Sequence, residues 1–171
     1  MPEMTLLGWF HTVLGLFALI SAFYTLLKFK IISFEQYSGR VYLLLTTVVA
    51  LSALGIYNQG GFGVAHMLAL LTLLAITGGA VTEKFKIFGS FSKYIQAFAY
   101  TSTVLFHMIP AITDFLRRLP VEDPFADSFD DPLILSFYLL LIVIYSIGLI
   151  LQIRWLSKDN LSINDHKKVT K

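Results

Sequence analysis

Three histidines lie within the apolar stretches of this sequence, and they are its best candidates for chemistry. His11 lies near the start of the first stretch, His66 near the start of the third and His107 near the end of the fourth. A polar side chain inside a membrane helix is costly and usually faces the interior of the bundle, so each of them is a functional candidate. The fourth histidine, His166, lies in a polar segment near the C-terminus, where we read it as solvated.

The three histidines share one level along the predicted bundle. Counted from the outer ends of their spans, His11, His66 and His107 lie about five, four and six residues deep, which at roughly 1.5 Å per residue is roughly 8, 6 and 9 Å. All three therefore fall within about one helical turn of the same level. We predict that their imidazoles converge in the outer leaflet.

Three imidazoles at one level indicate a ligand site. Imidazole is the commonest metal ligand in proteins, and three of them suit zinc, copper or iron. Two imidazoles on facing helices also suit haem b, held axially inside a bundle. We therefore assign His11, His66 and His107 as candidate ligands of a metal ion or of haem. The alternative is that each histidine simply hydrogen-bonds a neighbouring helix.

The residues around the histidines indicate which helix faces turn inward. Near His11 a stripe of small residues recurs at spacings of three and four, which lets helices approach closely: Gly8, Gly15, Ala18 and Ala22. Near His107 a polar face follows the same spacing and ends in Asp114, a further candidate metal ligand. Asp114 can equally pair with Arg117 or Arg118, at i+3 and i+4. The side chains expected to support the ligands are Tyr100, Thr103, Tyr138 and Tyr145.

Membrane helices are the elements that must position these residues. The chain is 56% hydrophobic and only 14% charged, with a mean hydropathy of +0.72, whereas soluble domains carry about 25% charged residues. Five apolar runs are long enough, or nearly so, to cross a core of ~30 Å: Leu6–Leu27, Val41–Tyr57, Phe62–Val81, Tyr94–Thr113 and Leu133–Trp155. We predict an all-α integral membrane bundle of five transmembrane helices, residues 1–155, followed by a basic tail, residues 156–171.

The basic residues predict the orientation of this bundle. Eleven of the thirteen lie at or after the ends of the first, third and fifth runs: Lys28, Lys30, Arg40, Lys84, Lys86, Lys93, Arg154, Lys158, Lys167, Lys168 and Lys171. By the positive-inside rule that side is cytoplasmic, so the N-terminus is outside and the C-terminus inside. The outer connection, residues 114–132, is acidic. It is a solvated loop or, because apolar positions in residues 115–130 recur near helical spacing, a short amphipathic helix over the bundle mouth.

Several classes of site and partner are excluded by what the sequence lacks. Without cysteine there can be no disulfide, thiolate metal site, iron–sulfur cluster or covalently attached haem. Phosphate-binding loops, H-E-x-x-H and G-x-S-x-G motifs are also missing. Because the basic residues are dispersed along the membrane edges, they favour anionic lipid headgroups as partners and not nucleic acid.

Four stretches carry a resemblance to a known family: HTVLG at 11–15, SGRVY at 38–42, GGFGVAH at 60–66 and LFHMIPAITD at 105–114. Over residues 8–155 the chain resembles a family of small, uncharacterised bacterial multi-pass inner-membrane proteins, which implies the same fold and location. In helix count and histidine placement it is also similar, by loose analogy, to small b561-type cytochromes.

Three functions remain open. The first is a metal- or haem-binding membrane protein in redox chemistry or in assembly of a membrane redox complex, with a quinone reaching the site sideways. The second is a zinc-dependent intramembrane hydrolase, in which Asp114 acts as base or orients a ligand. The third is a small transporter or interaction protein with a histidine-lined cavity. Because five helices are few for alternating access, transport would need a homo-oligomer.

Overall fold

The computed structural model describes residues 5–57 and 61–169, the stretch 159–169 by its backbone alone. These residues form five α-helices and one 3-10 turn, Gly89–Phe91, and no strand. The helices are α1 (Leu6–Phe29), α2 (Tyr37–Ala53), α3 (Val64–Phe85), α4 (Ser92–Arg118) and α5 (Pro132–Val169). The predicted all-α fold is confirmed.

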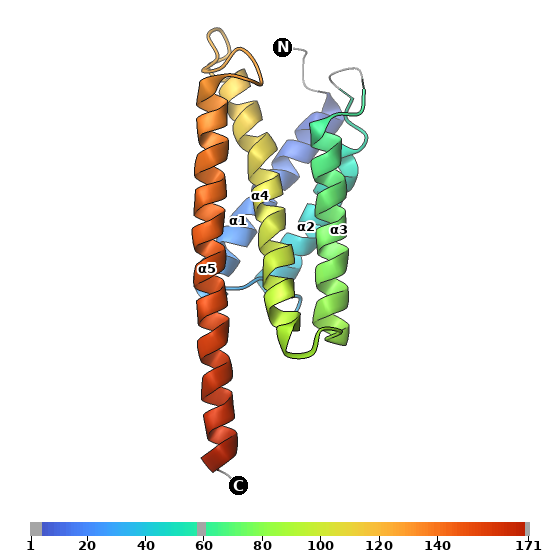
Figure 1. The fold of residues 1–171 in the computed structure, drawn as a ribbon. Coiled ribbons are helices and arrows are strands. Elements are labelled where there is room, and N and C mark those ends of the chain that lie inside the picture. The colour runs from blue at the N-terminus through green and yellow to red at the C-terminus, as the bar shows by residue number, and fades with distance from the viewer. Residues whose placement is uncertain (1–4, 58–60, 170–171) are drawn as a thin grey trace.

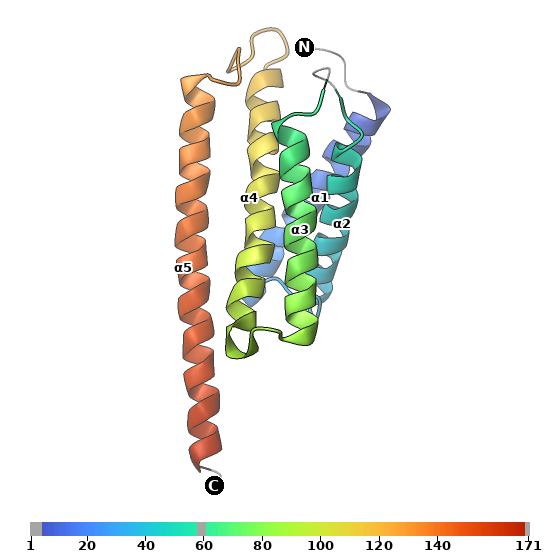
Figure 2. The same ribbon diagram turned by 45° about the vertical axis from the view of Figure 1, so that its right-hand side comes forward.

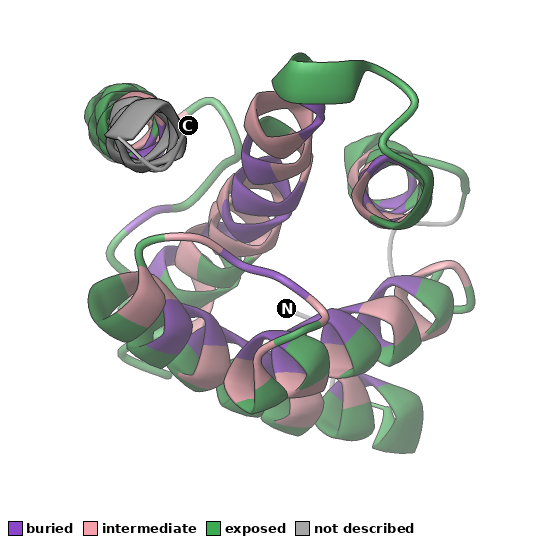
Figure 3. Ribbon diagram, turned by 90° about the horizontal axis from the view of Figure 1, so that it is seen from below, coloured by how far each residue is buried: buried purple, intermediate pink, exposed green. Residues whose placement is uncertain are grey.

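The helices run alternately up and down (Figures 1 and 2). The connections α1–α2 and α3–α4 lie at one end, called the lower end as drawn in Figure 1, and the connection α4–α5 lies at the upper end. Helix α1 packs on α2, and α3 packs on both α2 and α4. Helix α5 makes its extensive contacts with α4. Seen from below in Figure 3, buried faces of α1 to α4 turn toward one another, while α5 stands to the side.

Four helical segments are long and apolar enough to cross a membrane: Leu6–Phe29, Val64–Phe85, Gly89–Arg118 and Pro132–Lys158. Helix α2 is also apolar but has only 17 residues, about 25 Å at 1.5 Å per residue, against a hydrocarbon core of ~30 Å. The outward surface carries many exposed Leu, Ile, Val and Phe side chains. These features are those of a membrane protein with four helices of spanning length.

Helix ends differ from the predicted spans, because hydropathy marks the apolar stretch whereas caps and prolines stop the helix. Helix α2 ends at Ala53, so Tyr57 lies beyond it. Helix α4 continues to Arg118 and ends where Leu119 is extended before Pro120. Helix α5 continues through most of the predicted tail to Val169. Residues 58–60, Lys171 and the side chains of His166, Lys167 and Lys168 lie outside the described residues.

The predicted surface helix at residues 115–130 is wrong. Its first turn is the end of α4, and residues 119–131 form an irregular loop. Pro120 and Pro124 lack the N–H that a helix needs and disfavour helical backbone before them. The loop nevertheless packs on the upper end of α4, where the Arg117 guanidinium lies 3.8 Å from the centroid of the Phe129 ring.

Hydrogen bonds between side chains fasten α5 to α4. From the upper end downward the pairs are Thr113–Tyr138 at 2.6 Å, Ser102–Tyr145 at 2.8 Å and Thr101–Gln152 at 2.9 Å. In hydrocarbon a hydroxyl must find its partner within the protein, so this ladder fixes the face that α5 presents. The polar face predicted on α5 is thus inward, toward α4.

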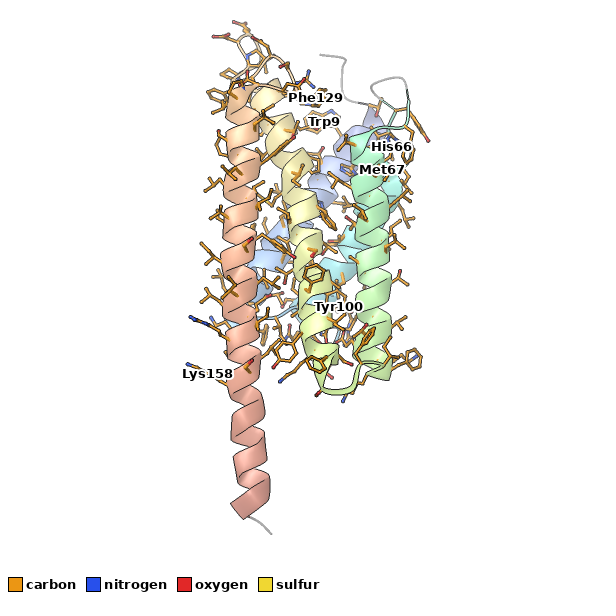
Figure 4. All side chains as sticks on the ribbon, viewed as in Figure 1. Trp9, His66, Met67, Tyr100, Phe129 and Lys158 are labelled. Carbon is orange, nitrogen blue, oxygen red and sulfur yellow. The ribbon has the colours of Figure 1, made fainter. Side chains whose placement is uncertain are left out.

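Glu83 anchors the α1–α2 connection at the lower end. Its Oε1 accepts from the Ser33 hydroxyl and, at 3.0 Å, from the Phe34 N–H, and its Oε2 accepts from the Tyr100 hydroxyl at 2.8 Å. The Tyr100 ring, labelled in Figure 4, packs against Gly79, where a Cβ would overlap it. One carboxylate therefore ties α3, α4 and the connection before α2 together.

We predict that Glu83→Ala destabilises the bundle. The change leaves three donors without their acceptor, and one buried unsatisfied donor already costs about 1–3 kcal/mol. Thermal unfolding in detergent, followed by helical circular dichroism, should show a clearly lower midpoint for this variant. Glu35→Ala is the matched control, because Glu35 is an exposed carboxylate of the same connection. Equal midpoints for the two variants would contradict the anchoring role.

Candidate functional site

The structure brings two of the three candidate histidines to one cavity. The cavity has a volume of about 60 Å³ and lies between α1, α2, α3 and α4, with His11 and His107 in its wall. Its other polar side chains are Thr46 and Thr72, and most of the remaining wall is alanine and other apolar residues. Small side chains on α2 and α3 thus leave room beside the two imidazoles.

The hydrogen bonds of His11 define which ring nitrogen carries the proton. Its Nδ1 lies 3.1 Å from the Val49 carbonyl oxygen and 3.0 Å from the Ser52 hydroxyl oxygen. A carbonyl can only accept, so Nδ1 is the protonated nitrogen and Nε2 bears the lone pair. Metal-binding histidines show this same arrangement, in which the second ring N–H is donated to a backbone carbonyl.

His107 approaches the same turn of α1 through a gap left by a glycine. Its Nε2 lies 3.1 Å from the position that a Cβ on Gly15 would take. Gly15 follows His11 by four residues, a spacing that puts Cβ positions about 5–6 Å apart on one helix face. The two rings therefore lie against neighbouring positions of one face of α1. The missing side chain of Gly15 leaves space next to the nitrogen of His107.

The Nε2 of His107 is buried and has no hydrogen-bond partner among the described residues. Leaving a buried polar group unsatisfied costs about 1–3 kcal/mol, so such a group in a folded protein needs an explanation. A bound ligand supplies one. The Phe106 carbonyl is a second unusual polar group in the same wall. Pro110, four residues later, has no N–H to donate to it.

His66 lies elsewhere, at the upper end of α3 (Figure 4). Its Nδ1 accepts from the Gly63 N–H at 3.1 Å, which caps the first turn of α3. Its ring lies between Tyr57 and Phe62, with centroid distances of 4.7 and 5.0 Å. Because Nδ1 accepts, Nε2 carries the proton and has no lone pair for a metal ion. This geometry makes His66 a helix cap.

None of the other predicted site residues lies in the wall of the cavity. Asp114 is exposed and pairs with Arg118, whose Nε lies 3.7 Å from its Oδ2. Thr103 hydrogen-bonds Tyr42 at 2.6 Å, and Tyr100 binds Glu83, as described above. Tyr138 and Tyr145 hold α5 to α4. Within the part of the chain that the structure describes, no three His, Asp or Glu side chains are grouped closely enough to hold a metal ion.

Haem b does not fit beside these nitrogens. A porphyrin is a wide planar ring around its iron, and the Nε2 of His107 already lies against α1 at Gly15. A single ion needs far less space, because metal–imidazole bonds are about 2.0–2.1 Å long for zinc and similar ions. The space at the cavity, about 60 Å³, therefore fits an ion and not the macrocycle.

Comparison with known proteins adds no chemistry to this geometry. No protein-family model, no curated protein and no solved structure matches the chain. The function must therefore be argued from the cavity and its two imidazoles.

The hydrogen bonds predict opposite neutral tautomers for two of the histidines. We expect His11 to be protonated at Nδ1 and His66 at Nε2, because the first donates to a carbonyl and the second accepts from an N–H. Two-dimensional ¹H–¹⁵N spectra of histidine-labelled protein, at a pH where the rings are neutral, distinguish the two forms. Ser52→Ala is the control and should leave the His11 tautomer unchanged, because the Val49 carbonyl remains. A His66 ring protonated at Nδ1 would contradict the capping geometry.

Proposed function

We propose that this chain is a multi-pass protein of the bacterial inner membrane that binds one metal ion through His11 and His107. One observation carries the proposal: His11, whose Nε2 bears a lone pair, and His107, whose Nε2 is buried without a hydrogen-bond partner among the described residues, both line one small cavity. Of the other polar side chains in the wall, Thr72 donates to the Leu68 carbonyl, whereas the buried Thr46 hydroxyl has no hydrogen-bond partner among the described residues. An ion would satisfy both nitrogens at once.

The same geometry favours a redox or ion-delivery function over a zinc hydrolase. Zinc hydrolases hold their ion with three protein ligands and leave one position for water, whereas this cavity offers two imidazoles and Asp114 is paired with Arg118. An ion bound by imidazoles suits electron transfer or delivery of the ion to a partner. We therefore place the protein in membrane redox chemistry or in assembly of a membrane redox complex, and not among hydrolases.

We further propose that the upper end faces the periplasm and that all five helices span the membrane. The support is the unequal charge: the lower end carries Lys28 and Lys30 at the end of α1 and Lys84 and Lys86 at the end of α3. A reporter fused after Lys171 should be active on the cytoplasmic side, and one inserted near Asp127 on the periplasmic side. Both reporters on the same side would exclude this topology.

Metal binding is tested with variants that separate the ligand role of His11 from its packing role. His11→Asn keeps an amide N–H for the Val49 carbonyl but removes the imidazole Nε2. We expect His11→Asn and His107→Ala to lose the bound ion, and His66→Ala, a control that removes a histidine outside the cavity, to keep it. The measurement is the metal-to-protein ratio of purified protein after metal loading and gel filtration. Equal ratios in all four proteins, wild type included, would refute the site.

A further inference from the structure

We infer that the ion held by His11 and His107 is monovalent copper. The inference rests on the proposed metal site and adds the identity of its ion. The donor set is the starting point: two neutral imidazoles border the cavity, and no third His, Asp or Glu joins them among the described residues. Asp114, the acidic residue predicted for the site, is 59% exposed and pairs with Arg118.

The charge of the site favours a monovalent ion. Neutral imidazoles contribute no negative charge, and the cavity lies between helices lined by alanine and other apolar side chains. The free-energy cost of moving an ion from water into such a medium rises with the square of its charge, so a divalent ion loses about four times as much as a monovalent ion of equal size. Among the described residues, no carboxylate lies in the wall of the cavity to compensate this loss.

The number of donors points the same way. Zinc sites use three or four protein ligands, and non-haem iron sites that contain histidine add a carboxylate to two imidazoles. Monovalent copper is a soft, closed-shell ion that is stable with two nitrogen donors, and imidazole is among the ligands that suit copper. The two imidazoles therefore make an adequate site for Cu(I) and an incomplete one for Zn(II) or Fe(II).

Gly15 provides a variant that perturbs the site without removing a ligand. A Cβ at this position would lie 3.1 Å from the Nε2 of His107, so Gly15→Ala fills the space beside that nitrogen and displaces the ring. The effect should resemble the loss of a group that orients a ligand, which lowers metal affinity by about 10–100-fold. Gly78→Ala is the matched control, because no atom lies within 4 Å of a Cβ at Gly78.

The test is a pair of competition titrations on the full chain in detergent, without oxygen. Cu(I) is titrated against a coloured Cu(I) chelator and Zn(II) against a zinc indicator, for wild type and for the variants His11→Asn, His107→Ala, His66→Ala, Gly15→Ala and Gly78→Ala. We expect one Cu(I) per chain, bound more tightly than Zn(II). Affinity should fall by more than about 100-fold in the two ligand variants, which exceeds the effect of losing an orienting group, and remain at the wild-type value in His66→Ala and Gly78→Ala.

The outcomes distinguish this inference from the proposed function beneath it. If Zn(II) binds more tightly than Cu(I) and depends on His11 and His107, the metal site stands and its assignment to copper is overturned. If neither ion depends on these two histidines, the metal site itself fails. Thermal unfolding midpoints of the variants, followed by helical circular dichroism and compared with wild type, show whether a loss of affinity arises from misfolding.

Discussion

A polar group that enters the hydrocarbon core of a bilayer can be satisfied only by the protein, and this constraint arranges the interior of the bundle. At the lower end the Glu83 carboxylate collects three donors. Higher up, Tyr42 and Thr103 pair with each other, and His11 donates to a carbonyl of α2. Among the described residues the Nε2 of His107 departs from this pattern, as do buried polar atoms of other side chains, Thr46 and His66 among them. Of these three residues, His107 and Thr46 line the cavity of the proposed site.

Close packing and ligand binding depend on the same feature of α1. Its small residues Gly8, Gly15, Ala18 and Ala22 are all buried, so α1 can approach its neighbours closely. At Gly15 this approach also leaves the gap that receives the ring of His107. A larger residue there would meet the Nε2 of His107 and displace its ring. The site is therefore a consequence of how α1 packs, and not an addition to an independent scaffold.

Features set by composition and helical periodicity could be predicted, whereas features set by side-chain rotation could not. Apolar runs predicted the five helices, and the small-residue stripe predicted the buried face of α1. Equal depth placed three histidines at one level, but depth does not define direction around the helix axis. His66 turns back to cap its own helix. Glu83 follows the apolar run, so hydropathy assigned it to a loop, although α3 continues to Phe85.

The central claim is that His11 and His107 bind one ion together. X-ray absorption of copper-loaded protein tests it most directly, because scattering from imidazole carbons identifies histidine ligands and their number. The account predicts two imidazoles per copper in the wild type and a single imidazole or no bound copper in His107→Ala. Copper surrounded by oxygen or sulfur neighbours, or two imidazoles that persist in His107→Ala, would contradict it.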